Sequence, residues 1–99
     1  MAETWTSRAD VATDAAERYA EQLASHLGRK AEVRDEPEGR RILVGDGGCL
    51  LVVGEAVLEL RAEAASAESL TRVQHVVGSH LERFGQRDAL VVTWRTPAP

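Results

Sequence analysis

The sequence predicts an α+β domain, a two-layer sandwich in which two helices lie on one face of an antiparallel sheet. Two segments predict the helices, because their apolar residues recur every three or four positions and form a single stripe. The rest of the chain predicts strands, because apolar and polar residues alternate there and Gly or Pro separates the runs. The predicted order is strand, helix, four strands, helix, strand (β-α-β-β-β-β-α-β).

The composition fits one folded domain over residues 1–99, with residues 96–99 as a frayed tail. Apolar residues make up 43% of the chain and charged residues 28%, which is typical of a globular protein. Sixteen acids exceed twelve Lys and Arg residues, giving a net charge of −4. This balance and the small number of aromatic residues argue against nucleic acid as a partner.

The first strand and first helix occupy the N-terminal part of the chain. Trp5 to Val11 alternate in polarity, so every second side chain of this strand is expected to be buried. Thr13 or Asp14 is expected to cap the helix, and Asp14 and Glu17 form a capping-box pattern at its start. Gly28 is expected to end it. The buried stripe of this helix is expected to contain Ala16, Tyr19, Ala20, Leu23 and Leu27.

Four short strands are predicted in the middle of the chain, at residues 31–34, 41–44, 49–53 and 57–62. Gly45 to Gly48 predict a tight hairpin turn, because Gly and Asp tolerate positive φ angles. Connections this short join neighbouring antiparallel strands, so a meander is expected.

The second helix is predicted from a Ser66 cap to about Phe84. Its expected stripe consists of Leu70, Val73, Val77, Leu81 and Phe84. Gly78 lowers helix propensity by about 1 kcal/mol relative to Ala, which indicates close packing against another element. Alternation at Leu90, Val92 and Trp94 predicts a final strand.

Cys49 is the only cysteine, which excludes an internal disulfide and a zinc cage built from cysteines. Its apolar strand predicts a small core residue rather than a nucleophile. The sequence shows neither a signal-peptide pattern nor an apolar run long enough to cross a membrane. We therefore expect a cytoplasmic protein without a membrane partner.

Two of the three histidines are candidate site residues. His26 lies about 60° from Leu23 on a helical wheel, and His80 lies about 20° from Val73, whereas His75 points about 160° away from the stripe. If the helices lie side by side, the imidazoles of His26 and His80 approach one another and could bind a metal or transfer protons. Alternatively, both are half-buried histidines satisfied by backbone carbonyls or carboxylates. A metal would need a further ligand, for which Cys49 and Glu82 are the candidates.

No nucleophile triad, carboxylate pair or cofactor motif stands out, so no cofactor other than a metal is considered. Lys30, the only lysine, closely follows the first helix and is a candidate ligand-binding cation. Its neighbouring arginines are interleaved with acids, so the local charge is nearly balanced.

Two segments resemble one known family. Residues 22–30 (QLASHLGRK) are similar to the LxxHxxHK segment of the domain-of-unknown-function family 2218, and residues 76–84 (VVGSHLERF) are similar to its VxxHLERF helix. In the first segment, Arg29 stands where the family has its second histidine, which argues against a His-x-x-His metal site in that helix.

The resemblance implies a small bacterial protein whose fold is similar to the C-terminal domain of phosphohexomutases, without implying mutase activity. It also implies a link to iron and siderophore handling, since some members of the family occur beside or fused to siderophore-interacting flavin reductases.

Three functions remain open from the sequence. The first is a non-enzymatic binding module for a small anionic ligand or an iron–siderophore, with His26, Lys30, His80, Arg83 and Arg87 as the candidate ligand-binding residues. The second is a small enzyme with His80 as general base and His26 or Lys30 as its partner. The third is a structural domain that dimerises through a sheet face or an edge strand, so the protein is expected to be a monomer or a homodimer.

Overall fold

The computed structural model of this chain describes residues 4–96. Its elements in chain order are β1 (Trp5–Ala12), α1 (Ala16–Leu27), β2 (Val33–Glu36), β3 (Gly39–Val44), β4 (Gly47–Gly54), β5 (Val57–Ala64), α2 (Ala67–Phe84) and the short 3₁₀ helix η1 (Gln86–Asp88). The end of the predicted frayed tail, residues 97–99, lies outside the described residues. No helix in the described part of the chain is long and apolar enough to cross a membrane.

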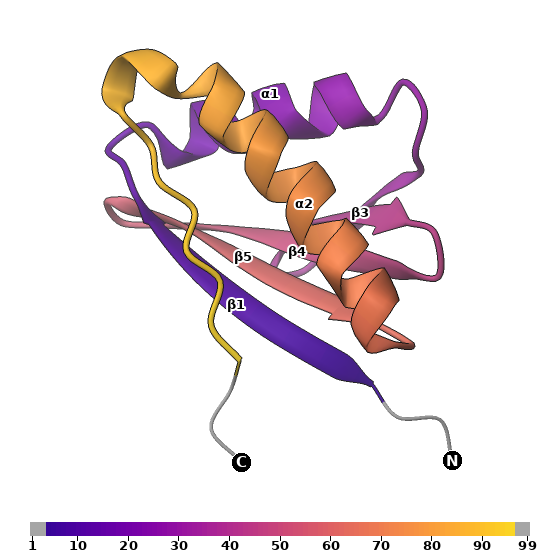
Figure 1. Cartoon of the computed structure of the whole chain (residues 1–99). Helices are drawn as coiled ribbons and strands as arrows, with labels where there is room; N and C mark the ends of the chain where they lie inside the picture. The colour runs from indigo at the N-terminus through magenta and orange to yellow at the C-terminus, as the bar shows by residue number, and fades with distance from the viewer. Residues whose placement is uncertain (1–3, 97–99) are drawn as a thin grey trace.

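The five strands form one antiparallel sheet in the order β1-β5-β4-β3-β2. The strands β2 to β5 form the predicted meander, and β1 adds to the far side of β5. Both helices lie on the same face of this sheet (Figure 1). The α+β two-layer fold is therefore confirmed.

The core lies between the helices and the inner face of the sheet. Leu51, Leu58 and Leu60 project from β4 and β5 and are at most 1% exposed. They pack against the predicted helix stripes, whose buried members include Leu23 of α1 and Val73, Val77 and Leu81 of α2. Trp5 was expected on this buried face but is 43% exposed, so the buried side of β1 begins at Ser7.

The helix ends agree with the sequence except at the start of α1, and Gly28 ends α1 as predicted. Ser66 caps α2 as predicted, since its Oγ accepts a hydrogen bond from the backbone N–H of Ser69 at 3.1 Å. The capping box at α1 is wrong: Ala15 occupies the N-cap position, and no side chain caps it. Thr13 instead closes the preceding turn, where its Oγ1 accepts a hydrogen bond from the Ala15 N–H at 3.0 Å.

The predicted final strand is reduced to a single bridge. Arg95 and Arg8 exchange two backbone hydrogen bonds of 2.8 Å, and no other residue of the C-terminal segment pairs with β1 in the described chain. Val92 and Trp94 instead turn toward α2, where a Cβ on Gly78 would lie 3.4 Å from Val92 Cγ1 and 3.1 Å from Trp94 Nε1. Because these side chains pack on α2, the described part of the segment pairs with the edge of β1 at Arg95 alone. Figure 1 shows the segment running between α2 and β1.

The face of the sheet opposite the helices carries alternating rows of charge. The strand register places the arginines in one row, Arg8, Arg61, Arg41 and Arg34, which Leu50 interrupts on β4. Acids from the same face and the adjoining loops bind these arginines: Asp10 and Glu59 bind Arg8, Glu59 and Glu38 bind Arg61, Glu36 and Glu63 bind Arg41, and Glu32 binds Arg34. We call this surface the charge ladder. In the charge ladder, the guanidinium groups of four arginines form ion pairs with acids of the same chain.

The packing of Trp94 against Gly78 predicts the effect of Gly78→Leu. A leucine side chain at this position has no room, and overpacking typically costs about 1–3 kcal/mol. Removing a helical glycine returns about 1 kcal/mol, so we expect a net loss of up to about 2 kcal/mol in the free energy of unfolding. In a Trp5→Phe background, Trp94 fluorescence should shift to the red as the indole moves into water.

Arg72→Leu changes an exposed position of the same helix and should leave the emission unchanged. If Trp94 in Gly78→Leu still emits at the wavelength of the parent protein, the contact between α2 and the C-terminal segment is contradicted.

Cys49 is a core residue, as predicted, and its burial can be tested by chemical labelling. It is 0% exposed, and burial raises the pKa of its thiol to about 12. At pH 8 we therefore expect an aromatic disulfide reagent to label Cys49 only as fast as the protein unfolds. Protein unfolded in guanidinium chloride is the control and should react at once. Rapid stoichiometric labelling of the folded protein would contradict the burial of this residue.

Candidate functional site

A cleft of about 740 Å³ lies where the end of α1, the middle of α2 and the strand β3 meet. Leu27, Arg29, Lys30, Ala31 and Glu32 line it from the end of α1 and the following loop, and Ile42 to Gly45 line it from β3 and its turn. The remaining lining residues are His26, Val76 and His80. The cleft therefore combines residues from both layers of the fold.

The two candidate histidines lie next to each other, His26 on α1 and His80 on α2. Their ring centroids lie 5.1 Å apart, and the ring planes are inclined by 44°. This proximity follows from the two buried stripes, because each histidine lies beside the stripe of its own helix and the helices pack next to one another. His26 is exposed and His80 is half-buried, so the pair stands at the solvent-facing side of the core.

A backbone hydrogen bond fixes the neutral tautomer of one ring. The Nδ1 of His80 lies 2.6 Å from the carbonyl oxygen of Val76, one turn earlier in α2. A carbonyl can only accept, so Nδ1 carries the proton and the neutral ring keeps an unprotonated Nε2. Phe84 packs edge-on against the His26 ring, with centroids 5.1 Å apart. Both imidazoles are thus held by neighbours in α2.

Two cations stand at the cleft without an acidic partner. Arg29 and Lys30 are both exposed, and neither forms an ion pair with any residue in the range 4–96. Among these residues, the one acid that lines the cleft is Glu32, and its carboxylate accepts a hydrogen bond from Arg34 Nε at 2.5 Å. The charge presented to a ligand in the cleft is therefore positive.

The floor of the cleft is apolar. Leu27, Val44 and Val76 are half-buried and line it, whereas Ile42 is fully buried and offers no exposed surface. Pockets that take small molecules commonly combine such a floor with a few polar groups that fix the orientation of the ligand. This arrangement suits a ligand with an apolar body and an anionic group.

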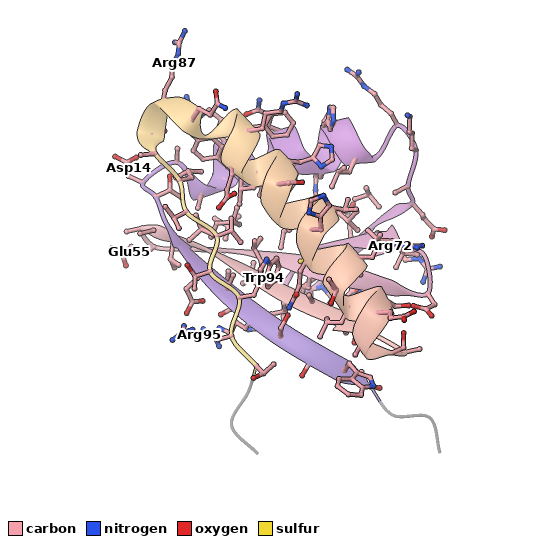
Figure 2. All side chains as sticks on the ribbon, in the orientation of Figure 1. Asp14, Glu55, Arg72, Arg87, Trp94 and Arg95 are labelled. Atoms are coloured by element: carbon pink, nitrogen blue, oxygen red, sulfur yellow. The ribbon has the colours of Figure 1, made fainter. Side chains whose placement is uncertain are left out.

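The structure brings together three of the five candidate ligand-binding residues. His26, Lys30 and His80 line the cleft, whereas Arg83 and Arg87 do not. Arg83 lies nearly one turn beyond His80, and Arg87 lies in η1, from which its side chain points outward at the end of the molecule (Figure 2). The sequence does not show where a cleft ends, so it does not separate these two arginines from the residues that line it.

Sequence reasoning missed Arg29 as a cleft residue. It counted Arg29 in a balanced basic cluster, although the acids around it pair with other arginines. The signal that was available is its position directly after the end of α1, next to Lys30 and near His26.

Neither residue considered as a third metal ligand reaches the histidines. Cys49 is buried in β4, and its Sγ contacts the Leu50 carbonyl oxygen at 3.9 Å. Glu82 is turned toward the C-terminal segment, where its carboxylate accepts a hydrogen bond from the Val92 N–H at 2.9 Å. Within residues 4–96, no three His, Cys, Asp or Glu side chains gather in a way that could hold a metal. His75 is exposed as predicted, in a groove with Trp94 on another side of α2.

Comparison with known proteins agrees with the resemblance seen in the sequence. The model of the family described as uncharacterized proteins conserved in bacteria (DUF2218) matches residues 8–95. The NMR structure of PA4090 from Pseudomonas aeruginosa is similar, with a TM-score of 0.75 and 32% sequence identity. The match covers 92% of this chain and 95% of that one. No functionally curated protein matches. With nearly its whole length matched by the family model, this chain belongs to the bacterial family DUF2218.

Proposed function

We propose that this chain is a non-enzymatic binding module whose cleft takes a small anionic ligand with an apolar or aromatic body. The observation that carries the proposal is the pair of unpaired cations, Arg29 and Lys30, beside two imidazoles at an apolar cleft. The cations would bind the carboxylate or catecholate oxygens of the ligand, and the floor would bind its apolar part.

The distribution of charge supports an anion despite the net charge of −4. Seven arginines pair with acids, four of them in the charge ladder and three elsewhere; the seven are Arg8, Arg18, Arg34, Arg40, Arg41, Arg61 and Arg95. Five cations have no such partner within residues 4–96, and these are Arg29, Lys30, Arg72, Arg83 and Arg87. Two of the five line the cleft, so it is a local positive site on an acidic molecule.

An iron–siderophore is the more specific ligand within this class. A ferric catecholate is anionic and aromatic, which are the two properties that the cleft selects. The resemblance of residues 22–30 and 76–84 to a family linked with siderophore reduction motivates this choice. A free aromatic carboxylate shares the same chemistry, and the titrations below separate the two.

The alternative of a His-dependent enzyme has one supporting feature: the Nδ1 hydrogen bond of His80 leaves Nε2 as the nitrogen that can accept a proton, which a general base requires. Its neighbour Ser79 offers no nucleophile, since the Ser79 hydroxyl donates to the carbonyl oxygen of His75 at 2.5 Å. Among the described residues, those lining the cleft include no Ser, Thr or Cys. The cleft therefore favours binding over nucleophilic catalysis.

Titration of the protein with benzoate, 2,3-dihydroxybenzoate and the ferric complex of 2,3-dihydroxybenzoate tests the proposal. We expect amide chemical shifts of cleft residues to change with a dissociation constant below about 1 mM, which corresponds to roughly 4 kcal/mol of binding free energy. Single Arg29→Ala and Lys30→Ala variants should weaken binding about 2- to 5-fold each, because exposed charge pairs contribute up to about 1 kcal/mol.

Arg72→Ala is the matched control, since Arg72 is also exposed and unpaired but does not line the cleft. Its affinity should equal that of the wild type. Absence of shift changes at the cleft with millimolar benzoate and both catechol probes would exclude the proposed function. Tighter binding of the ferric complex than of the free acids would select the iron–siderophore.

A further inference from the structure

We propose that His26 and His80 are the two protein ligands of a divalent transition-metal site, and that the anion bound in the cleft completes the coordination of the metal. The metals that suit such a site are Zn²⁺, Co²⁺, Ni²⁺ and Cu²⁺, which imidazole nitrogens bind well. This inference rests on the proposed function, because the same cleft supplies the anion.

The spacing of the two rings matches the spacing that a shared metal requires. A zinc ion lies about 2.0–2.1 Å from each ligating imidazole nitrogen, and hence roughly 3.2 Å from each ring centre. At a tetrahedral angle, two such ring centres lie about 5 Å apart. The centroids of His26 and His80 are separated by 5.1 Å. The helix packing thus holds the two ring centres at the separation that a shared metal would give.

The hydrogen bond of His80 is the second observation. Metal-binding histidines usually donate their other ring N–H to a carbonyl or carboxylate, which fixes the tautomer and orients the ring. His80 makes this contact through Nδ1 to the Val76 carbonyl oxygen at 2.6 Å. Its Nε2 is therefore the nitrogen available to a metal. His26 has an edge-on packing contact with Phe84, which restrains the position of its ring.

With only two protein ligands, the proposed metal site has coordination positions that the protein does not fill. Within the described residues no Cys, Asp or Glu completes a three-ligand set, so coordination positions stay open to water or an anion. Arg29 and Lys30 at the cleft repel a bare cation, and a bound anion offsets their charge. Metal and anion should therefore bind cooperatively, each strengthening the other by the same factor.

Calorimetric titration at pH 7.5 with Zn²⁺, in the absence and presence of saturating benzoate, measures this coupling. We expect benzoate to tighten Zn²⁺ binding by about 5- to 100-fold, and saturating Zn²⁺ to tighten benzoate binding equally, in the usual range for coupled sites. Co²⁺ in place of Zn²⁺ should give the strong visible absorption of a tetrahedral ion, which reports coordination independently of affinity.

His26→Gln and His80→Gln should each abolish the Co²⁺ spectrum and the coupling, with far-UV circular dichroism confirming that the variants fold. His75→Gln is the matched control, because His75 is exposed on the same helix as His80 but outside the cleft. This variant should leave the Co²⁺ spectrum and the coupling unchanged. A Co²⁺ spectrum lost in His75→Gln, or kept in both cleft variants, would overturn the site.

The outcomes separate this inference from the proposed function. Benzoate binding at the cleft with no Zn²⁺ binding at millimolar metal overturns the metal site and leaves the binding module standing. Binding of Zn²⁺ through both histidines with no effect of benzoate overturns the anion as a metal ligand. Failure of benzoate to bind, with or without metal, removes the proposed function as well.

Discussion

The packing of two helices side by side on one face of the sheet is the constraint on which the rest of the structure depends. The sheet offers one continuous apolar face, formed mainly by leucines of β4 and β5, and each helix offers one stripe narrow enough to leave room for the other. Burial of apolar surface, at about 25 cal/mol per Å², fixes both helices in this place. His26 and His80 lie beside these stripes, so the interaction that forms the core also sets the distance between the imidazoles.

The second organising feature is the division of charge between the two faces. On the uncovered face, alternating rows bring acids and arginines together in the charge ladder, where Arg41 is the most deeply placed cation, with its side chain 22% exposed. Glu36 shows the effect, since its hydrogen bonds with Arg41 hold the pKa of its carboxyl below the usual range. The helix layer lacks such a ladder, and its cations at the cleft stay unpaired within the described chain. The same arginine-rich composition thus serves cohesion on one face and leaves a local positive site on the other.

The sequence predicted the features that depend on local periodicity and missed those that depend on competition between elements. Alternation and helical spacing were sufficient for the five-stranded sheet, both helices and the Ser66 cap. The final strand failed because Val92 and Trp94 had two possible partners, β1 and α2, and the space above Gly78 favoured α2. Wheel angles placed His26 and His80 correctly, whereas nothing in the sequence separated Lys30, which lines the cleft, from Arg83 and Arg87, which do not. The limits of a cleft depend on where loops end, and periodicity does not describe loops.

The single bridge between Arg8 and Arg95 has a consequence for how the sheet is terminated. An eight-residue edge strand is a template for uncontrolled association, because its free N–H and C=O groups invite another strand. Here the bridge occupies the edge at Arg8, and Arg95 also donates to the carboxylate of Asp10 at 3.0 Å. A foreign strand would have to displace the C-terminal segment and break this ion pair before it could align with β1. This one contact therefore occupies the open edge of β1 near its middle.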